Sequence, residues 1–100
     1  ADTVTYSAAI SACGKGGQWQ QALEILDAME KMGCAPDVVS YSAAISACGR
    51  NGQWQRALEL LEAMDGSKGI RPNTTSYNSA ITACEKAGRW QEALRLLGRM

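Results

Sequence analysis

Four cysteines are the residues with the most evident chemistry in this sequence of 100 residues, because thiolates form disulfides and ligate zinc. Cys13, Cys48 and Cys84 are spaced 35 and 36 residues apart, and the sequence has neither a C-x-x-C pair nor a histidine. This regular spacing indicates that the three residues occupy one repeated structural position. We therefore predict that they are small buried apolar residues, reduced and without a bound metal.

Groups that could carry out acid–base or nucleophilic catalysis are not combined anywhere in the sequence. It contains no histidine to act as a general base, no glycine-rich phosphate loop after a strand, and no paired carboxylates outside the polar faces of predicted helices. We expect a protein that is not an enzyme and that has no cofactor and no small-molecule substrate.

The basic residues indicate a different chemistry, the binding of phosphate groups. The formal net charge is zero, but Lys15, Arg50 and Lys86 recur at intervals of 35 and 36 residues, and only Glu85 lies near them in the same kind of segment. Most acidic residues fall in other segments, at Glu24, Asp27, Glu30, Glu59, Glu62, Asp65 and Glu92. The three cations therefore predict a positive stripe along which phosphates could lie. The alternative is that each cation complements the dipole of a helix at its C-terminal end.

An internal repeat explains these intervals. The segment YSAAISACG starts at Tyr6 and again at Tyr41, and YNSAITAC starts at Tyr77. The segments GQWQQALEIL, GQWQRALELL and GRWQEALRLL follow with the same spacing. The additional residue of the second interval falls in DGSKGIRPN, where an insertion costs little. Repetition at this period is typical of a solenoid.

Each repeat contains the pattern of two helices. In the first block Tyr6, Ile10 and Cys13 share one helical face, and in the second block Trp19, Leu23 and Leu26 do so. Glycines separate the two blocks and prolines end the repeat, because glycine accepts the left-handed conformation and a proline disfavours helix before it. The predicted helices span residues 4–15, 18–32, 39–50, 53–65, 75–86 and 89–100.

The predicted fold class is all-α, a right-handed α-solenoid of helix–turn–helix repeats. The repeats are 3–37, 38–73 and 74–100, the last of them truncated. The first helices should line the concave side, and Trp19, Trp54 and Trp90 should be largely buried between the two helices of their repeats. Apolar stretches are far shorter than the roughly 20 residues that cross a bilayer, so we expect no membrane insertion.

The blocks V-x-Y-[SN]-x-x-I-x-A-C and G-x-W-x-x-A-L-x-L-L-x-x-M, followed by P-[DN], resemble the pentatricopeptide repeat over essentially the whole chain. The three tryptophans depart from the aliphatic residue that is more usual at their position. The resemblance implies a piece of a longer solenoid that binds single-stranded RNA, one base per repeat, in a mitochondrion or chloroplast. The sequence itself shows no targeting segment.

The resemblance also assigns residues to roles. Base reading would fall to the pairs Ser7 with Asp37 and Ser42 with Asn73, and to Asn78 in the third repeat. A carboxylate only accepts hydrogen bonds, as guanine's N–H groups require, whereas an amide both donates and accepts. The family position that wedges between bases is occupied by Val4, Val39 and Thr75. The phosphate-contacting residues would be Lys15, Arg50 and Lys86.

Each role has a structural alternative. Ser7, Ser42 and Asn78 fit polar positions on a solvated helix face, Asp37 and Asn73 are good N-caps, and β-branched residues at a helix start fit ordinary packing. The whole array has an alternative too, a protein-interaction scaffold that binds subunits of a larger organellar complex. Its zero net charge and its three repeats favour that alternative.

Overall fold

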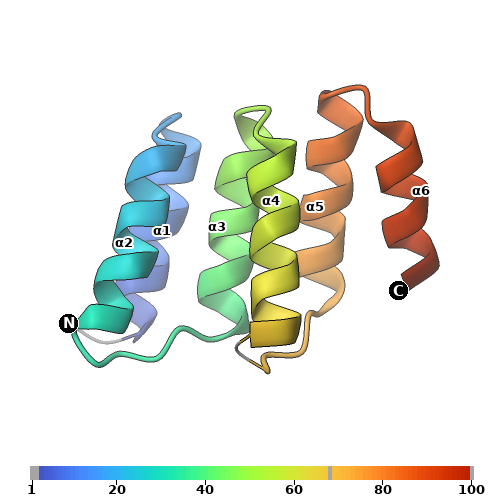
Figure 1. The fold of residues 1–100 in the computed structure, drawn as a ribbon. Helices are drawn as coiled ribbons and strands as arrows, with labels where there is room; N and C mark the ends of the chain where they lie inside the picture. The colour runs from blue at the N-terminus through green and yellow to red at the C-terminus, as the bar shows by residue number, and fades with distance from the viewer. Residues whose placement is uncertain (1–2, 68, 100) are drawn as a thin grey trace.

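The computed structural model describes residues 3–67 and 69–99, and these form antiparallel helices joined by short connections (Figure 1). The elements are α1 (Thr3–Lys15), α2 (Trp19–Lys31), α3 (Val38–Arg50), α4 (Trp54–Glu62), the π-helical segment η1 (Ala63–Ser67), α5 (Thr74–Lys86) and α6 (Trp90–Arg99). The predicted bounds differ by at most one residue, except at the end of α4. The predicted last residue, Met100, lies outside the described part of the chain.

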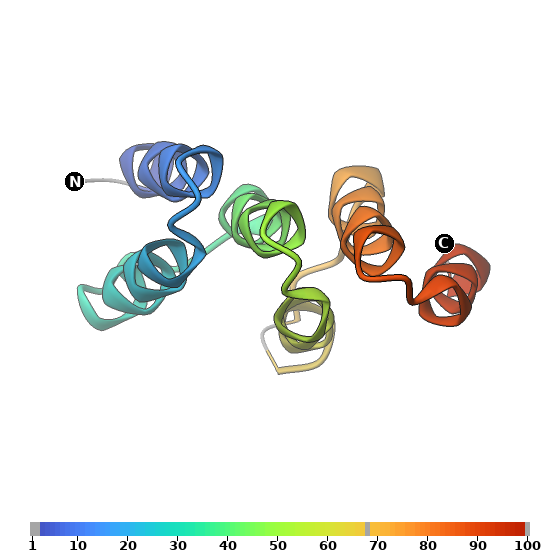
Figure 2. The same ribbon diagram turned by 90° about the horizontal axis from the view of Figure 1, so that it is seen from above.

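The helices lie in two layers, which are seen end-on in Figure 2. One layer consists of α1, α3 and α5, and each of these packs against the next; the other consists of α2, α4 and α6. Each helix also packs against its partner in the same hairpin, as α1 does against α2. This stacking of hairpins confirms the predicted all-α solenoid. We call the two layers the A layer and the B layer.

The turns inside the hairpins depend on glycine. Gly17, Gly52 and Gly88 have φ angles of 80°, 73° and 74°, which are in the left-handed region. Residues with a Cβ atom adopt these angles only at a cost, and glycine does not. The predicted helix ends at these three positions are therefore confirmed.

The core fills the space between the layers and continues from one hairpin to the next. Its largest fully buried side chains are Ile10, Met29, Ile45, Cys48, Leu61, Met64 and Cys84. The prediction of buried cysteines is therefore correct for two of them and only partly correct for Cys13, which is half-buried because α1 has a neighbour on one side of its layer. Among the described residues, no helix has the length and apolarity that a membrane span requires.

The second hairpin takes up its additional residue in an unexpected place. The sequence pattern predicted a helix that ends at residue 65 and a loose loop over residues 65–73, whereas α4 ends at Glu62 and continues as the π-helical segment η1 to Ser67. A π-turn holds one residue more than an α-turn, so it absorbs an insertion without ending the helix. Met64 stays fully buried in this segment. The insertion thus lies at least partly inside the B layer.

The tryptophans are less buried than predicted. Trp19 and Trp54 are half-buried, and Trp90 is 64% exposed. The guanidinium of Arg89, from the next hairpin, lies 4.6 Å from the centre of the Trp54 ring and covers part of it. Trp90 begins α6, the last helix of the described residues, so none of these residues forms a later hairpin over it. The prediction was therefore wrong for Trp90, because this position is covered by the following repeat as well as by its own.

Candidate functional site

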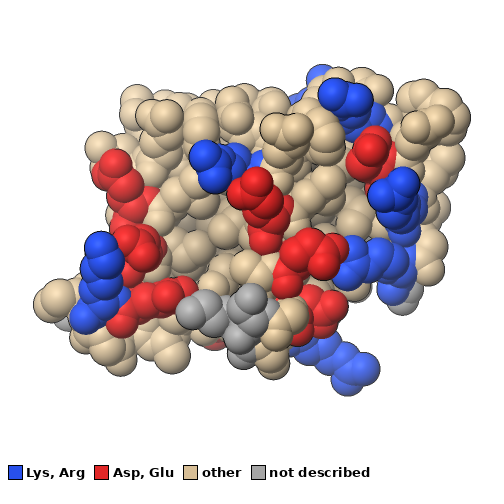
Figure 3. Space-filling view, viewed as in Figure 1, with Lys and Arg blue, Asp and Glu red and all other residues tan. Residues whose placement is uncertain are grey.

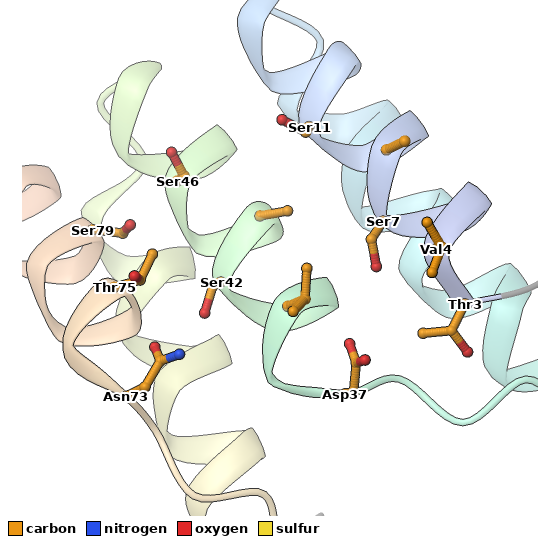
Figure 4. A pocket seen from close by; sticks show the side chains of 13 residues that line it. Thr3, Val4, Ser7, Ser11, Asp37, Ser42, Ser46, Asn73, Thr75 and Ser79 are labelled. Carbon is orange, nitrogen blue, oxygen red and sulfur yellow. The ribbon is translucent and has the colours of Figure 1, made fainter.

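A groove runs across the A layer on the side away from the B layer. We call it the large groove; its volume is about 630 Å³, and it is open to solvent (Figure 4). It is lined by Thr3, Val4, Ser7, Ala8, Ser11, Asp37, Val39, Ser42, Ala43, Ser46, Asn73, Thr75 and Ser79. Most of these side chains are small, so the floor of the groove remains accessible. It contains all predicted base-reading and wedge residues except Asn78.

The predicted base-wedging residue of each hairpin lines the large groove. Val4 and Val39 are 76% and 58% exposed, although valine is normally found inside proteins. Thr75 is exposed at the equivalent place on α5. The packing alternative is therefore wrong for the two valines, because they contact too little protein to contribute to the core. They present apolar surface to whatever enters the groove.

The serines of the reading pairs are buried, not solvated. Ser7 and Ser42 are 7% and 6% exposed and lie on the A-layer faces that meet the next hairpin. The Ser7 hydroxyl lies 2.8 Å from the Ser40 hydroxyl, and the Ser42 hydroxyl lies 2.7 Å from that of Ser76. The solvated-face alternative is therefore wrong for these two serines. Each is held at the floor of the large groove by a contact between hairpins.

Asp37 and Asn73 act as N-caps, as the alternative interpretation proposed. The Oδ1 atom of Asp37 accepts a hydrogen bond of 3.0 Å from the backbone N–H of Ser40. In the same way Asn73 Oδ1 accepts one of 2.9 Å from Ser76 N. Both side chains are also exposed and line the large groove. Because the cap uses only Oδ1, the other terminal atom of each side chain remains available to a ligand.

The remaining predicted residues lie further along the A layer. A second hollow, which we call the small groove, adjoins the large one and shares Ser46, Thr75 and Ser79 with it. Asn78, Arg50 and Lys86 line it, whereas Lys15 lines neither groove. The three cations occupy the last turns of α1, α3 and α5, so the helix-dipole alternative is also met.

The two layers differ in their charged groups. Acidic side chains gather over α2 and α4 on the face of the B layer (Figure 3). Several pair with cations of the same layer: Asp27 with Lys31, Glu59 with Arg56, and Glu62 and Asp65 with Arg99. The helices of the B layer, η1 included, carry seven acidic and four basic residues, whereas those of the A layer carry three basic residues and one acidic residue, so the zero net charge of the chain is the sum of a negative layer and a positive remainder. The cations at the ends of the A-layer helices belong to a different surface.

Two residues of the site were not singled out from the sequence. Ser40 and Ser76 are fully buried, and their hydroxyls donate to Oδ1 of Asp37 and Asn73 at 3.1 and 3.0 Å. Each of them also contacts the serine of the preceding hairpin. The signal in the sequence was their repetition directly before Tyr41 and Tyr77. The repetition by itself gave no hint of a polar role for this position.

Comparison with known proteins identifies the repeat. The model of the PPR repeat family matches residues 1–50 and 36–85, and the PPR repeat model matches residues 75–100. The chain belongs to the PPR repeat family. No curated protein matches it by sequence. The PPR repeats of the chain thus cover it from end to end, in agreement with the resemblance found in its motifs.

Solved PPR structures share the fold. One is the pentatricopeptide repeat protein PPR10 from maize, with a TM-score of 0.90 and 27% identity over 99% of this chain. Another is PPR10 in complex with an 18-nt psaJ RNA element, with a TM-score of 0.89 and 27% identity over 100% of this chain. The chain spans only 14% and 15% of the PPR10 chains in those two structures.

Proposed function

We propose that this chain is a single-stranded RNA-binding module in which each hairpin contacts one base. The observation that carries the proposal is that each of the first two repeats brings an exposed valine and a reading pair to the same groove. The valine offers an apolar face against which a base can stack, and the reading pair offers polar atoms to the edge of that base.

The relative PPR10 supports the choice of ligand, because it was solved in complex with an RNA element. The same A layer carries the basic residues Lys15, Arg50 and Lys86 in successive hairpins. Cations at such regular intervals suit a ligand with regularly spaced negative charges, and a nucleic acid backbone has them. We therefore place the bases in the large groove and the phosphates near these three residues.

The reading pairs set the proposed sequence. Ser7 with Asp37 favours G, Ser42 with Asn73 favours A, and Asn78 favours a pyrimidine, which gives 5′-G-A-pyrimidine-3′. The test is an NMR titration of the chain at low salt with short uridine-rich RNAs that contain G-A-U, A-A-U or G-G-U. NMR suits the weak binding expected here, because stacking contributes roughly 1–3 kcal/mol per base.

Replacement of Asp37 tests whether this residue determines the base preference at the first position. Asp37→Asn keeps an Oδ1 acceptor for the cap and adds an N–H donor, so we expect the preference at the first base to move from G toward A. The preference for A over G at the second base should not change, and this is the internal control. An unchanged preference at both bases would contradict the assignment of the pair.

Replacement of Lys15, Arg50 and Lys86 tests whether these residues contact the phosphate groups of the RNA. Lys15→Ala, Arg50→Ala and Lys86→Ala together should weaken all three RNAs alike. The slope of log K against log salt should flatten by about 2, at about 0.7 for each lost phosphate contact with a single strand. A matched control removes three B-layer cations, by Lys31→Ala, Arg56→Ala and Arg95→Ala. If the control flattens the slope equally, the cations act only through net charge.

The scaffold alternative predicts a different result. Its support in the chain is the zero net charge. If the chain binds none of the RNAs at low salt and a protein subunit instead occupies the large groove, the scaffold function replaces the RNA-binding function proposed here. We further propose binding without catalysis, and a mitochondrial or chloroplast location for the whole protein, both by analogy with the pentatricopeptide family. Organelle fractionation of the full-length protein tests the location.

A further inference from the structure

Ser40 connects the two members of a reading pair, Ser7 on α1 and Asp37, the N-cap of α3. Its hydroxyl donates to Asp37 Oδ1 at 3.1 Å and lies 2.8 Å from the hydroxyl of Ser7. Ser40 itself is fully buried and cannot reach a ligand. A continuous chain of hydrogen bonds therefore runs from Ser7 on α1 through Ser40 to Asp37 before α3.

Ser76 makes the same connection in the next hairpin. Its hydroxyl donates to Asn73 Oδ1 at 3.0 Å and lies 2.7 Å from the hydroxyl of Ser42. It too is fully buried. The connection is therefore a repeated feature of the described hairpin junctions and not an isolated contact.

The number of hydrogens on each group decides the direction of these bonds. A serine hydroxyl has one hydrogen, and an ionised carboxylate has none. Since Ser40 uses its hydrogen on Asp37, it can only accept from Ser7, so the hydrogen of Ser7 points away from the groove. Ser7 then offers only lone pairs to a ligand.

Counting the available hydrogens also gives the bond directions in the second reading pair, Ser42 with Asn73. Asn73 Oδ1 accepts from both the backbone N–H and the hydroxyl of Ser76, which identifies it as the amide oxygen. Ser76 thus accepts from Ser42, and Ser42 offers only lone pairs. The Nδ2 group of Asn73 keeps its hydrogens for a ligand.

We propose that Ser40 and Ser76 are positioning residues that fix the hydrogen-bonding polarity of the two reading pairs; this rests on the RNA-binding function proposed above. The first pair then presents acceptors only, on Ser7 Oγ and Asp37 Oδ2, which suits the N–H groups of guanine. The second pair presents an acceptor on Ser42 and a donor on Asn73 Nδ2, which suits adenine's amino group and ring nitrogen.

The test compares Ser40→Ala with Ser40→Thr by the same NMR titration. In Ser40→Ala the Ser7 hydroxyl loses its acceptor and can turn to donate, so discrimination of G against A at the first base should fall about fivefold, the effect of roughly one hydrogen bond. Discrimination at the second base should not change. Threonine keeps the hydroxyl, and Thr5 already occupies the equivalent position in the first repeat, so Ser40→Thr should restore discrimination.

Ser76→Ala is the matched variant, with its effect expected at the second base and not at the first. A merely structural role would weaken binding to all RNAs and leave discrimination unchanged, and this result would overturn the proposal while the proposed function stands. Failure of the wild-type chain to bind any RNA would overturn both. In the free chain, the hydroxyl proton of Ser7 should exchange with water faster in Ser40→Ala than in wild type, and equal rates would also overturn the proposal.

Discussion

Gly14 of α1 lies directly against Ala47 of α3: a Cβ atom added at Gly14 would stand 2.7 Å from the Cβ of Ala47 and 2.8 Å from its Cα. Real Cβ atoms do not approach backbone this closely, so the two helices touch where glycine has no side chain. Gly49 repeats this arrangement against Ala83 of α5, with its added Cβ 3.2 Å from the Cβ of Ala83. The spacing of the A layer therefore depends on these glycines.

Gly14→Ala should destabilise the chain by about 1–3 kcal/mol, because the added methyl forces α1 and α3 apart. Urea denaturation followed by circular dichroism measures the effect. Gly98→Ala is the control, because a Cβ there meets no atom within 4 Å, and alanine in a helix is about 0.5–1 kcal/mol more favourable than glycine. If the two variants are equally stable, the close approach of the helices is not as described.

Asp37→Ala should destabilise the chain by about 1 kcal/mol, because the backbone N–H of Ser40 loses the acceptor that caps α3. Asp37→Asn retains an oxygen at that place and should change stability by much less. Thermal unfolding of the two variants at one pH makes the comparison. Equal losses would show that the carboxylate charge, and not the cap, matters, and the asparagine variant would then be a poor probe of base preference.

Stability should fall between pH 10 and pH 12 because of Tyr41. Its side chain is 2% exposed and donates to Glu30 Oε1 at 3.3 Å; burial, and then the charge and hydrogen bond of Glu30, raise its pKa from 10 to about 12. The unfolded chain thus loses this proton at lower pH than the folded chain, so a stabilisation present below pH 10 disappears as the pH rises to 12. The loss is on the order of 2 kcal/mol.

Urea denaturation at several pH values checks this loss. Tyr41→Phe should flatten the dependence between pH 10 and pH 12. Burial also raises the pKa of the Cys48 thiol to about 11, but this group is present in both proteins and its effect cancels in the comparison. An identical pH dependence in wild type and Tyr41→Phe would contradict the role given to the phenol.

The four cysteines should react with iodoacetamide in two classes. Cys48 and Cys84 are buried, and burial raises the pKa of both thiols, whereas Cys13 and Cys34 are half-buried. Since the thiolate is the nucleophile, the rise of the Cys48 pKa from 9 to about 11 lowers its thiolate population at pH 8 about 100-fold. Peptide mapping by mass spectrometry at pH 8 should find Cys13 and Cys34 modified first. In urea all four should react at similar rates.

The repeated pattern in the sequence predicted the helices and the turn glycines, because both depend on local periodicity. The residues that line the large groove were assigned through the resemblance to the pentatricopeptide repeat. It did not predict the exposure of Trp90, since the cover of this position comes from another hairpin, as Arg89 covers Trp54. The bond between Ser40 and Ser7 was equally hidden, because it depends on how closely neighbouring hairpins approach.

The π-helical segment η1 separates repeat length from groove geometry. The junction between Ser7 and Ser40 spans 33 residues and that between Ser42 and Ser76 spans 34, yet their hydroxyl distances, 2.8 and 2.7 Å, are nearly equal. The longer repeat therefore places its A-layer residues at the same spacing as the shorter one. Its extra length is taken up after α4, where the π-helical segment η1 begins. An array of such repeats can therefore contain repeats of different length, while a polymer bound along the A layer still meets evenly spaced contacts.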